Sequence, residues 1–215
     1  MFRHWPFHVL MLYCEGNSLG SRRCGKPQAA LVEATIILPG EIGMPNKILV
    51  TYASCTGSTV GVAEAIGQTL SEGGLQVEVR PMKDVQDVTP FHAVVAGSAI
   101  QNKQWLAEAM QFMQTHKVAL AQKPFAAFLV CMTLAMKKGD QYRGFVSDFL
   151  QPVRALVKPV SEGLFAGALD IRKVPSASNR IKFRLSVLFG VWSEGDHRDW
   201  NAIRTWAENI RPFLS

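Results

Sequence analysis

The chain has 215 residues, of which 48% are hydrophobic, so its length allows one globular domain with a substantial core. No apolar run approaches the ~20 residues that cross a bilayer as a helix. The formal net charge of +6 favours an anionic partner, such as a membrane surface or an acidic substrate. We expect no nucleic-acid partner, because the sequence has neither a known nucleic-acid module nor interleaved aromatic and basic residues.

Residues 1–46 lack the periodicity of the rest of the chain. The short apolar run Phe7–Cys14 resembles part of a signal peptide, but no convincing cleavage site follows it. Met44 stands just before the first predicted strand. We therefore predict that natural translation starts at Met44, the alternative being a disordered or targeting extension. The folded domain is predicted to span residues 47–215.

The first predicted strand, Ile48–Tyr52, leads into a turn rich in hydroxyl groups and then directly into a helix. The turn comprises Ser54, Cys55, Thr56, Gly57, Ser58 and Thr59 and contains no Lys or Arg. The backbone N–H groups and dipole of a helix N-terminus bind phosphate without a cationic side chain, and hydroxyls add hydrogen bonds. Glycine lets the backbone approach the anion closely. The turn is therefore a candidate phosphate site, with an ordinary capped β–α turn as the alternative.

Other phosphate-binding motifs do not match this turn. Gly57 and Gly61 do not form the dinucleotide fingerprint G-x-G-x-x-G, and no Gly-Lys-Ser/Thr closes a nucleoside triphosphate loop. A cysteine phosphatase built on Cys55 would need an arginine where Gly61 stands. A phosphate monoester ligand remains the best interpretation.

Strand and helix patterns alternate through the rest of the domain. Four further apolar segments predict strands at Leu75–Val79, Phe91–Gly97, Phe125–Met132 and Gly163–Leu169. Helical spacing predicts helices at Val62–Leu70, about 104–117, Tyr142–Val157 and Asp199–Ile210. The alternation predicts an α/β doubly wound parallel sheet, whose ligands bind beyond the carboxyl ends of the strands.

Two further loops are candidates for that ligand site. The predicted third strand is followed by residues with small or polar side chains that allow a flat ring to approach, namely Gly97, Ser98, Ala99, Ile100, Gln101 and Asn102. The fourth is followed by Cys131, Met132 and Thr133. Trp105 and Tyr142 have the aromatic surface to stack on a ring, but we expect both to pack as ordinary helix residues.

The cysteines indicate neither a metal site nor disulfide pairing. The chain has four, Cys14, Cys24, Cys55 and Cys131, without metal-ligand spacing such as C-x-x-C. Cys55 and Cys131 each end a predicted strand, where we expect a reduced thiol to pack as a small hydrophobe. A reducing, cytoplasmic location follows as the simplest prediction.

These motifs together resemble the flavodoxin-domain family throughout residues 47–215. Within it the chain is most similar to the menaquinone-dependent protoporphyrinogen oxidase group. The motifs that carry the resemblance are Ser54–Thr59, Val94–Ile100, Phe165–Leu169 and the pair Asp199-Trp200. The segment Gln101–Trp105 departs from the aromatic, basic run of the characterised enzymes.

The resemblance implies a flavodoxin-like, five-stranded parallel sheet of order 2-1-3-4-5. FMN is the implied cofactor, with its phosphate on Ser54–Thr59 and its ring bordered by Gly97–Asn102 and Cys131–Thr133. In that family FMN takes electrons from a reduced porphyrin precursor and passes them to a quinone at the membrane. No other arrangement of catalytic or metal-binding residues in the sequence indicates a second chemistry.

An insertion at 170–198 precedes the last helix and exceeds the usual β–α connection of about two to six residues. Within 180–192, basic residues alternate with or precede large apolar ones. Such a segment suits the surface of an anionic membrane, the alternative being a helix packed on the domain with a solvated basic end. The resemblance favours a helix over a strand here. We expect His197, alone in a polar turn, to be solvated.

Three functional hypotheses follow. The first is an FMN oxidoreductase that oxidises protoporphyrinogen IX or a related donor and reduces a quinone, cytoplasmic or peripheral on the inner face of the membrane. The second is an electron-transfer module whose donor and acceptor are proteins. The third is a non-redox binding domain that keeps the fold.

Overall fold

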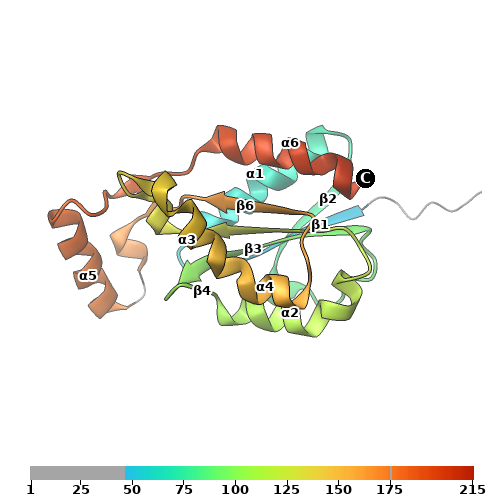
Figure 1. The fold of residues 1–215 in the computed structure, drawn as a ribbon, viewed down its shortest axis with the longest axis horizontal. Helices are drawn as coiled ribbons and strands as arrows, with labels where there is room; N and C mark the ends of the chain where they lie inside the picture. Colours follow the sequence, from blue (N-terminus) through green and yellow to red (C-terminus); the bar gives the residue numbers. More distant parts are fainter. Residues whose placement is uncertain (1–46, 175) are drawn as a thin grey trace, which may run out of the picture. The chain divides into compact units, whose positions relative to one another are not determined.

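The computed structural model describes residues 47–174 and 176–215, so the predictions for residues 1–46 lie outside the described residues. Five strands form a parallel sheet in the order β2-β1-β3-β5-β6 (Figure 1). They are β1 Lys47–Ala53, β2 Gln76–Pro81, β3 Ala93–Gln101, β5 Phe125–Val130 and β6 Ser161–Phe165. In chain order this arrangement is 2-1-3-4-5, so the predicted flavodoxin-like sheet is confirmed.

Helices cover both faces of the sheet (Figure 1). One face carries α1 Ser58–Glu72 and α6 Trp200–Leu214, and the other carries α2 Ala107–Leu120, α3 Arg143–Ser147 and α4 Gln151–Leu156. Alternate residues of β1 enter two cores: Ile48 and Val50 pack on the α1/α6 side, while Leu49 packs on the α2 side. The central strands are buried on both faces, which explains why they appear as continuous apolar runs.

The end of β3 differs from the prediction. The strand continues beyond Gly97 to Gln101 and turns back into β4, Gln104–Trp105, which pairs with it antiparallel. Asn102 and Lys103 form the turn with φ values of 51° and 65°. Two consecutive left-handed residues are typical of a two-residue hairpin turn, usually Asn-Gly, and Lys103 in the second position concealed it. Trp105 therefore belongs to a strand, and α2 begins after it.

Two other elements are divided. The segment predicted as the fifth strand contains two strands. The first, β6, stays in the sheet and ends at Phe165, whereas the short β7, Ala168–Leu169, leaves the sheet and pairs with β8, Gly195–Asp196, in the insertion. The predicted helix Tyr142–Val157 consists of α3 and α4 separated by the 3₁₀ turn η4, Asp148–Leu150. Pro152 stands in the first turn of α4, where its missing N–H leaves no helical bond unmade. The other 3₁₀ turns are η1 Met82–Asp84, η2 Met132–Ala135, η3 Gly139–Tyr142 and η5 Ile171–Lys173.

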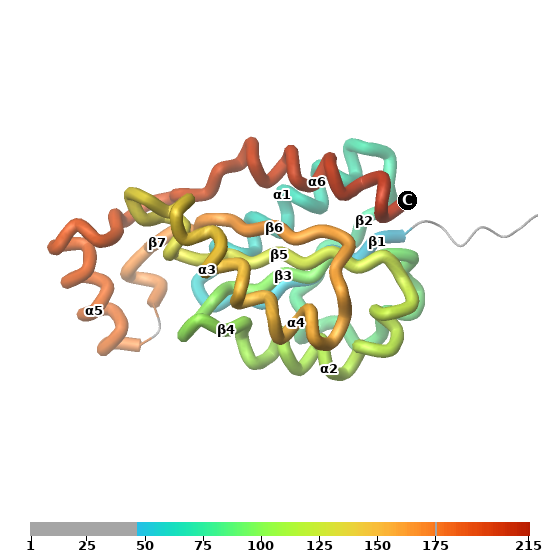
Figure 2. The backbone as a smooth tube through the Cα atoms, in the orientation of Figure 1, coloured from blue at the N-terminus to red at the C-terminus, as the bar shows by residue number. Residues whose placement is uncertain are grey.

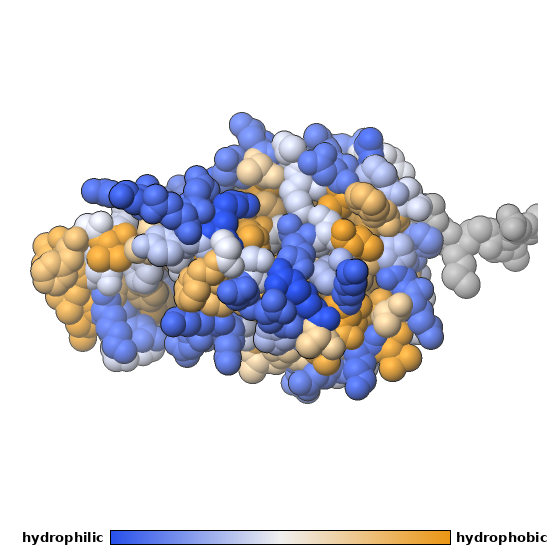
Figure 3. Space-filling view, viewed as in Figure 1, coloured by the Kyte–Doolittle hydropathy of each residue, from blue (hydrophilic) through white to orange (hydrophobic). Residues whose placement is uncertain are grey.

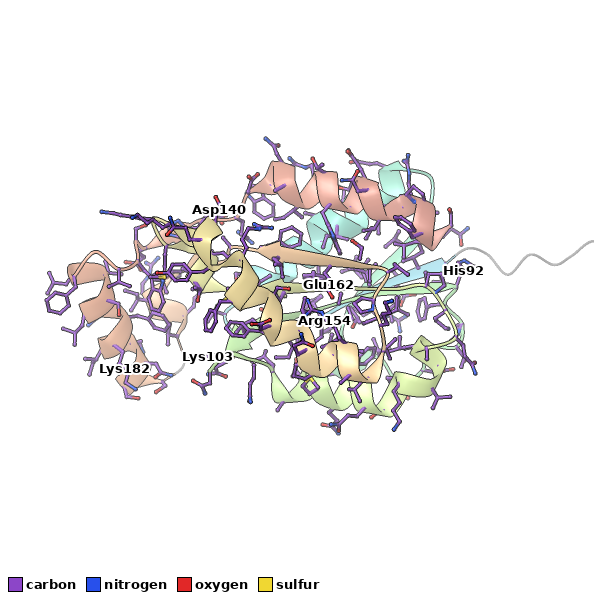
Figure 4. The ribbon with its side chains drawn as sticks, viewed as in Figure 1. His92, Lys103, Asp140, Arg154, Glu162 and Lys182 are labelled. Carbon is purple, nitrogen blue, oxygen red and sulfur yellow. The ribbon has the colours of Figure 1, made fainter. Side chains whose placement is uncertain are left out.

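Helix α4 is tied to the edge of the sheet by an ion pair. Arg154 Nε and Nη2 donate to the two carboxylate oxygens of Glu162 on β6, at 2.6 and 2.5 Å (Figure 4). Arg154 Nη2 also donates to Ser147 Oγ at 2.7 Å. The two-pronged contact with a carboxylate fixes the direction of α4 across β6.

The insertion contains the helix α5, Ala177–Leu188, so the expectation of a helix there is confirmed. This helix lies beyond the carboxyl ends of the parallel strands, at the opposite end from the chain's C-terminus (Figure 2). None of its residues is buried. Among the described helices, none is long and apolar enough to cross a membrane.

Candidate functional site

The loop between β1 and α1 is shaped by Gly57 and Ser54. Gly57 has a φ of 93°, a left-handed conformation that side chains with a Cβ rarely adopt. Its N–H donates to Ser54 Oγ at 3.1 Å, which closes the loop just before α1 begins at Ser58. The conformation of this loop therefore explains why a hydroxyl stands at Ser54 and a glycine at position 57.

The N-terminus of α1 has neither a side-chain cap nor an acidic residue in its first turn. The start of α6 is different, because the Asp199 carboxylate accepts the N–H groups of Asn201 and Ala202, each at 3.0 Å. The first-turn N–H groups of a helix have no partner within the helix. Those of α1 therefore remain available to an anion, and its dipole favours negative charge there.

Hydroxyl groups surround this helix start. Thr56 and Ser58 line a cavity of about 200 Å³ at the carboxyl ends of the strands. Thr59 is fully buried, and its Oγ1 lacks a hydrogen-bond partner among the described residues. A buried hydroxyl without a partner is costly and uncommon. This set of donors fits a phosphate group, which accepts several hydrogen bonds at once.

The cavity beside the hydroxyls has mainly apolar walls. They are formed by Ile100, Leu106, Val130, Met132, Leu169, Val174 and Phe183. A second cavity of about 450 Å³ adjoins it, and the two share Ile100, Gln101, Met132, Asn179 and Phe183 as lining residues. Ligand pockets commonly measure about 300–1,000 Å³. The two cavities together offer that space, with polar donors at one end and apolar walls beyond.

Most of the residues predicted from the sequence lie on these walls. The first cavity is lined by Cys55, Thr56, Ser58, Ala99, Ile100, Gln101 and Met132. The second is lined by Ile100, Gln101, Asn102, Cys131, Met132 and Thr133. Of the remaining candidates, Ser54, Gly57 and Thr59 belong to the β1–α1 turn and the start of α1 rather than line either cavity. The topology thus brings all three predicted loops to one place.

Gly97 and Ser98 do not lie on a cavity wall, because β3 is still inside the sheet at these positions. A Cβ on Gly97 would lie 2.0 Å from the ring of Phe128, so glycine is required for core packing. The Ser98 hydroxyl accepts the N–H of Leu106 at 3.0 Å and donates to the carbonyl of Ala99 at 2.8 Å. Both residues therefore have roles in the fold, and neither is among the residues that line the two cavities.

The cysteines and aromatics follow the predictions only in part. Cys131 is buried, as expected, but Cys55 is exposed at the cavity rim, because the strand ends before it. Trp105 is buried and packs in the core, as expected, whereas Tyr142 is 40% exposed. Neither aromatic residue is among those that line the two cavities.

The insertion supplies site residues that the sequence pattern did not identify. Asn179 and Phe183 of α5 line both cavities, and Ser176 lines the first. Gly167 faces the first cavity, and a Cβ there would lie 3.2 to 3.4 Å from Val130, Met132 and Ser58. Gly167 precedes the insertion, in the motif Phe165–Leu169. For the residues of α5 the sequence signal was the length of the insertion, which does not reveal where the inserted helix lies.

An arginine from the insertion reaches the start of α1. Arg198 Nη1 donates to the backbone carbonyl of Ser58 at 3.2 Å, and its guanidinium lies over the ring of Trp200, 4.3 Å from the centroid. The hydrogen bond from Arg198 lowers the pKa of Asp196. The ion pair therefore connects β8 to the first turn of α1.

The second cavity has a positive lining. Lys103, from the β3–β4 turn, and Lys182, from α5, both line it, and they lie on the same side of the molecule (Figure 4). No Asp or Glu is among the described residues that line this cavity. Lys103 Nζ also lies 5.5 Å from the centroid of the Phe145 ring, a cation–π distance.

Comparisons with known proteins agree with the fold. A family model described as a flavodoxin domain matches residues 49–188. No curated protein matches the chain. A short-chain flavodoxin associated with a non-canonical PDU bacterial microcompartment has a TM-score of 0.52 and 14% identity, with 79% of this chain and 99% of that chain covered.

Two other solved structures are similar. An archaeal flavodoxin has a TM-score of 0.47 and 19% identity over 78% of this chain and 98% of its own. Flavodoxin 2 from Bacillus cereus has a TM-score of 0.45 and 26% identity over 65% of this chain and 99% of its own. None of these matches supports the narrower likeness to protoporphyrinogen oxidases. The family model alone covers more than half of the sequence, so the chain belongs to the flavodoxin-domain family.

Proposed function

We propose that this protein binds FMN and transfers electrons through it. One observation carries the proposal: the uncapped N-terminus of α1 and its hydroxyls open into a cavity at the carboxyl ends of β1, β3 and β5. This end of a parallel sheet is where ligands of doubly wound folds bind. The similar protein associated with a bacterial microcompartment is a flavodoxin, which agrees with a flavin ligand.

The residues present fit FMN in both of its parts. Thr56, Ser58 and the first-turn N–H groups of α1 would hold the phosphate. The apolar side chains of Ile100 and Met132 would lie against the flavin ring and limit its access to water. The bound flavin supplies the redox chemistry, and the protein supplies its binding and environment.

The phosphate site favours FMN over FAD. The loop offers one helix N-terminus, and the chain lacks the glycine fingerprint that accommodates a pyrophosphate. We therefore expect a monophosphate to bind more tightly than a dinucleotide.

Identification of the flavin in the purified protein tests this proposal. The cofactor is extracted by denaturation and identified by chromatography, and the apoprotein is then titrated with FMN and FAD while flavin fluorescence is followed. We expect FMN in the extract and preferential binding of FMN. A colourless protein without affinity for either flavin would refute the proposed function and leave the non-redox binding domain as the alternative.

The second cavity favours an oxidoreductase with an organic substrate over a pure electron carrier. It adjoins the proposed flavin site and is lined by the aromatic residues Phe145, Phe149, Phe183 and Trp192. A protein that only exchanges electrons with a docked partner needs no such aromatic-lined space beside its flavin. A reduced porphyrin precursor as donor and a quinone as acceptor remain narrower proposals, which rest on the family resemblance described from the sequence.

Anaerobic reduction assays separate these possibilities. Flavin reduction is followed by absorbance after addition of protoporphyrinogen IX, and reoxidation is followed after addition of a soluble quinone. Reduction by the porphyrin precursor would support the narrower proposal. Reduction by a protein donor alone would favour the electron-transfer module.

A further inference from the structure

Helix α5 presents two different faces. With about 3.6 residues per turn, Ile181, Leu185 and Leu188 fall on one stripe, opposite Asn179 and Phe183. Asn179 and Phe183 line the cavities, whereas the side chains on the opposite stripe are exposed. The apolar stripe of α5 therefore has no part in the candidate site, which is lined by the opposite face.

The exposed stripe continues beyond the helix to form an apolar surface. The insertion patch is defined here as Ile181, Leu185, Leu188, Phe189 and Val191. Leu188 and Phe189 are 78% and 77% exposed, more than any other large hydrophobic residue in the described part of the chain. Figure 3 shows hydrophobic surface at the end of the molecule formed by α5. Exposed apolar surface concentrated in one segment marks an interaction site.

The charges carried by α5 itself are all positive, and the acidic residue nearest in sequence, Glu194, accepts the backbone N–H of Ile171. Arg180, Lys182 and Arg184 are exposed on α5, and residues 176–193 contain no Asp or Glu. On the helix, Arg184 falls on one side of the apolar stripe and Lys182 on the other. The surface therefore complements a partner that is both anionic and apolar.

We propose that the insertion patch inserts into the interface of an anionic lipid bilayer. Helices that lie in this interface combine a large apolar face with Lys and Arg on the polar side, and Phe and Leu enter the acyl boundary. The α5 residues that line the first cavity, Asn179 and Phe183, point away from the patch, so membrane contact leaves the proposed flavin site in place. This inference goes beyond the proposed function and does not depend on flavin binding.

Vesicle binding by the full chain tests the proposal. The probe is vesicles of phosphatidylglycerol and phosphatidylcholine in equal parts, compared with vesicles of phosphatidylcholine alone, and binding is measured by flotation at low and high salt. We expect tighter binding to the anionic vesicles and weakening by salt, because the attraction decays over about a Debye length of roughly 10 Å at 0.1 M salt. Equal binding to both vesicle types would overturn the proposal.

Two pairs of variants separate the charged and apolar contributions. Neutralising Arg180 and Arg184 together (R180Q/R184Q) should weaken binding roughly 30-fold, because each cation near an anionic surface contributes about 1 kcal/mol. L188S/F189S should weaken binding by on the order of tenfold or more. The matched controls are K117Q/R204Q and V118S/F213S, which change exposed residues of the same kinds on α2 and α6.

The outcomes identify the occupant of the patch. Loss of binding in the α5 variants but not in the controls, with unchanged circular dichroism, supports the membrane proposal. Equal effects in both sets, or no vesicle binding by the wild type at low salt, overturn it. Dimerisation in light scattering that L188S/F189S abolishes, without vesicle binding, would assign the patch to a second copy of the chain.

Discussion

The β1–α1 loop and the helix α5 border the same cavity but are held in place very differently. The loop is continuous with β1 and α1, whose residues Leu49 and Ile66 are completely buried. Helix α5 contributes two cavity-lining side chains, Asn179 and Phe183, yet none of its residues is buried. A segment with few buried contacts opens at low energetic cost, while elements joined to the core stay fixed. We therefore expect the firmly held β1–α1 loop to determine the affinity for the phosphate group, and the loosely held helix α5 to determine which ligands enter the cavity.

The largest difference between the two regions should appear in stability. Phe128 is fully buried against Phe165 and Trp206, with ring centroids 6.3 and 6.2 Å apart. Phe128→Ala should lower the free energy of unfolding by ~3–5 kcal/mol. Phe183 has one aromatic neighbour, Trp192, at 5.3 Å, so Phe183→Ala should cost only about 1 kcal/mol. Urea unfolding of both variants checks this, and similar losses would show that α5 is as firmly packed as the sheet.

The next effect concerns the phosphate. Thr56→Ala removes a hydroxyl at the cavity and should weaken FMN binding by ~1.5–3 kcal/mol, about 10- to 100-fold. Unfolding should change little, because Thr56 is not buried. Thr115→Ala, at an exposed position of α2, is the matched control. If fluorescence titration gave the same FMN affinity for both variants, Thr56 would have no part in phosphate binding.

A smaller effect on binding is expected from the insertion. Asn179→Ala and Phe183→Ala should each weaken FMN binding less than tenfold, since α5 can adjust its position and the phosphate contacts persist. Asn201→Ala, at an exposed position of α6, serves as the control for the amide. If either variant lost more FMN affinity than Thr56→Ala, then α5 rather than the β1–α1 loop would be the main determinant of FMN binding.

The smallest effect is the pH dependence that arises from Asp196. Its carboxylate accepts hydrogen bonds from Arg198, which lower its pKa in the folded protein. A lowered folded pKa gives stability that is present above the unfolded pKa of about 3.9 and is lost as the pH falls through the folded pKa. Because the Asp196 side chain is 42% exposed, solvent screening keeps this contribution small.

Asp196→Asn should therefore reduce stability at neutral pH slightly and remove this part of the acid sensitivity. Unfolding midpoints measured from pH 7 to below pH 4 should converge for wild type and variant at the acidic end. A difference that stays constant down to the lowest pH would show that the ion pair does not link β8 to α1 in solution.

The sequence predicted which segments form the sheet more accurately than where each strand ends. Buried parallel strands such as Phe125–Val130 are apolar on both faces and stand out in any sequence. The β3–β4 hairpin was missed because Lys103 occupies a turn position that usually carries glycine. β7 was missed because the apolar pattern continues past the point where the chain leaves the sheet.

The part of the candidate site that is formed by residues close together in the sequence was predictable. Thr56 and Ser58 stand two positions apart in the sequence, on a turn between the regular elements β1 and α1. Asn179 and Phe183 reach the cavity only through the placement of a long insertion, which no local pattern encodes. Arg198 is likewise brought to Ser58 by tertiary structure alone.

The affinities of the apoprotein for FMN and for riboflavin provide the most direct measurement of the phosphate site. The two ligands share the flavin ring and differ only in the phosphate, so their difference isolates the contribution of the loop and the start of α1. We predict that FMN binds at least roughly tenfold more tightly and that Thr56→Ala narrows the difference. Equal affinities for FMN and riboflavin, or no binding of either, would contradict a phosphate-anchored flavin in this cavity.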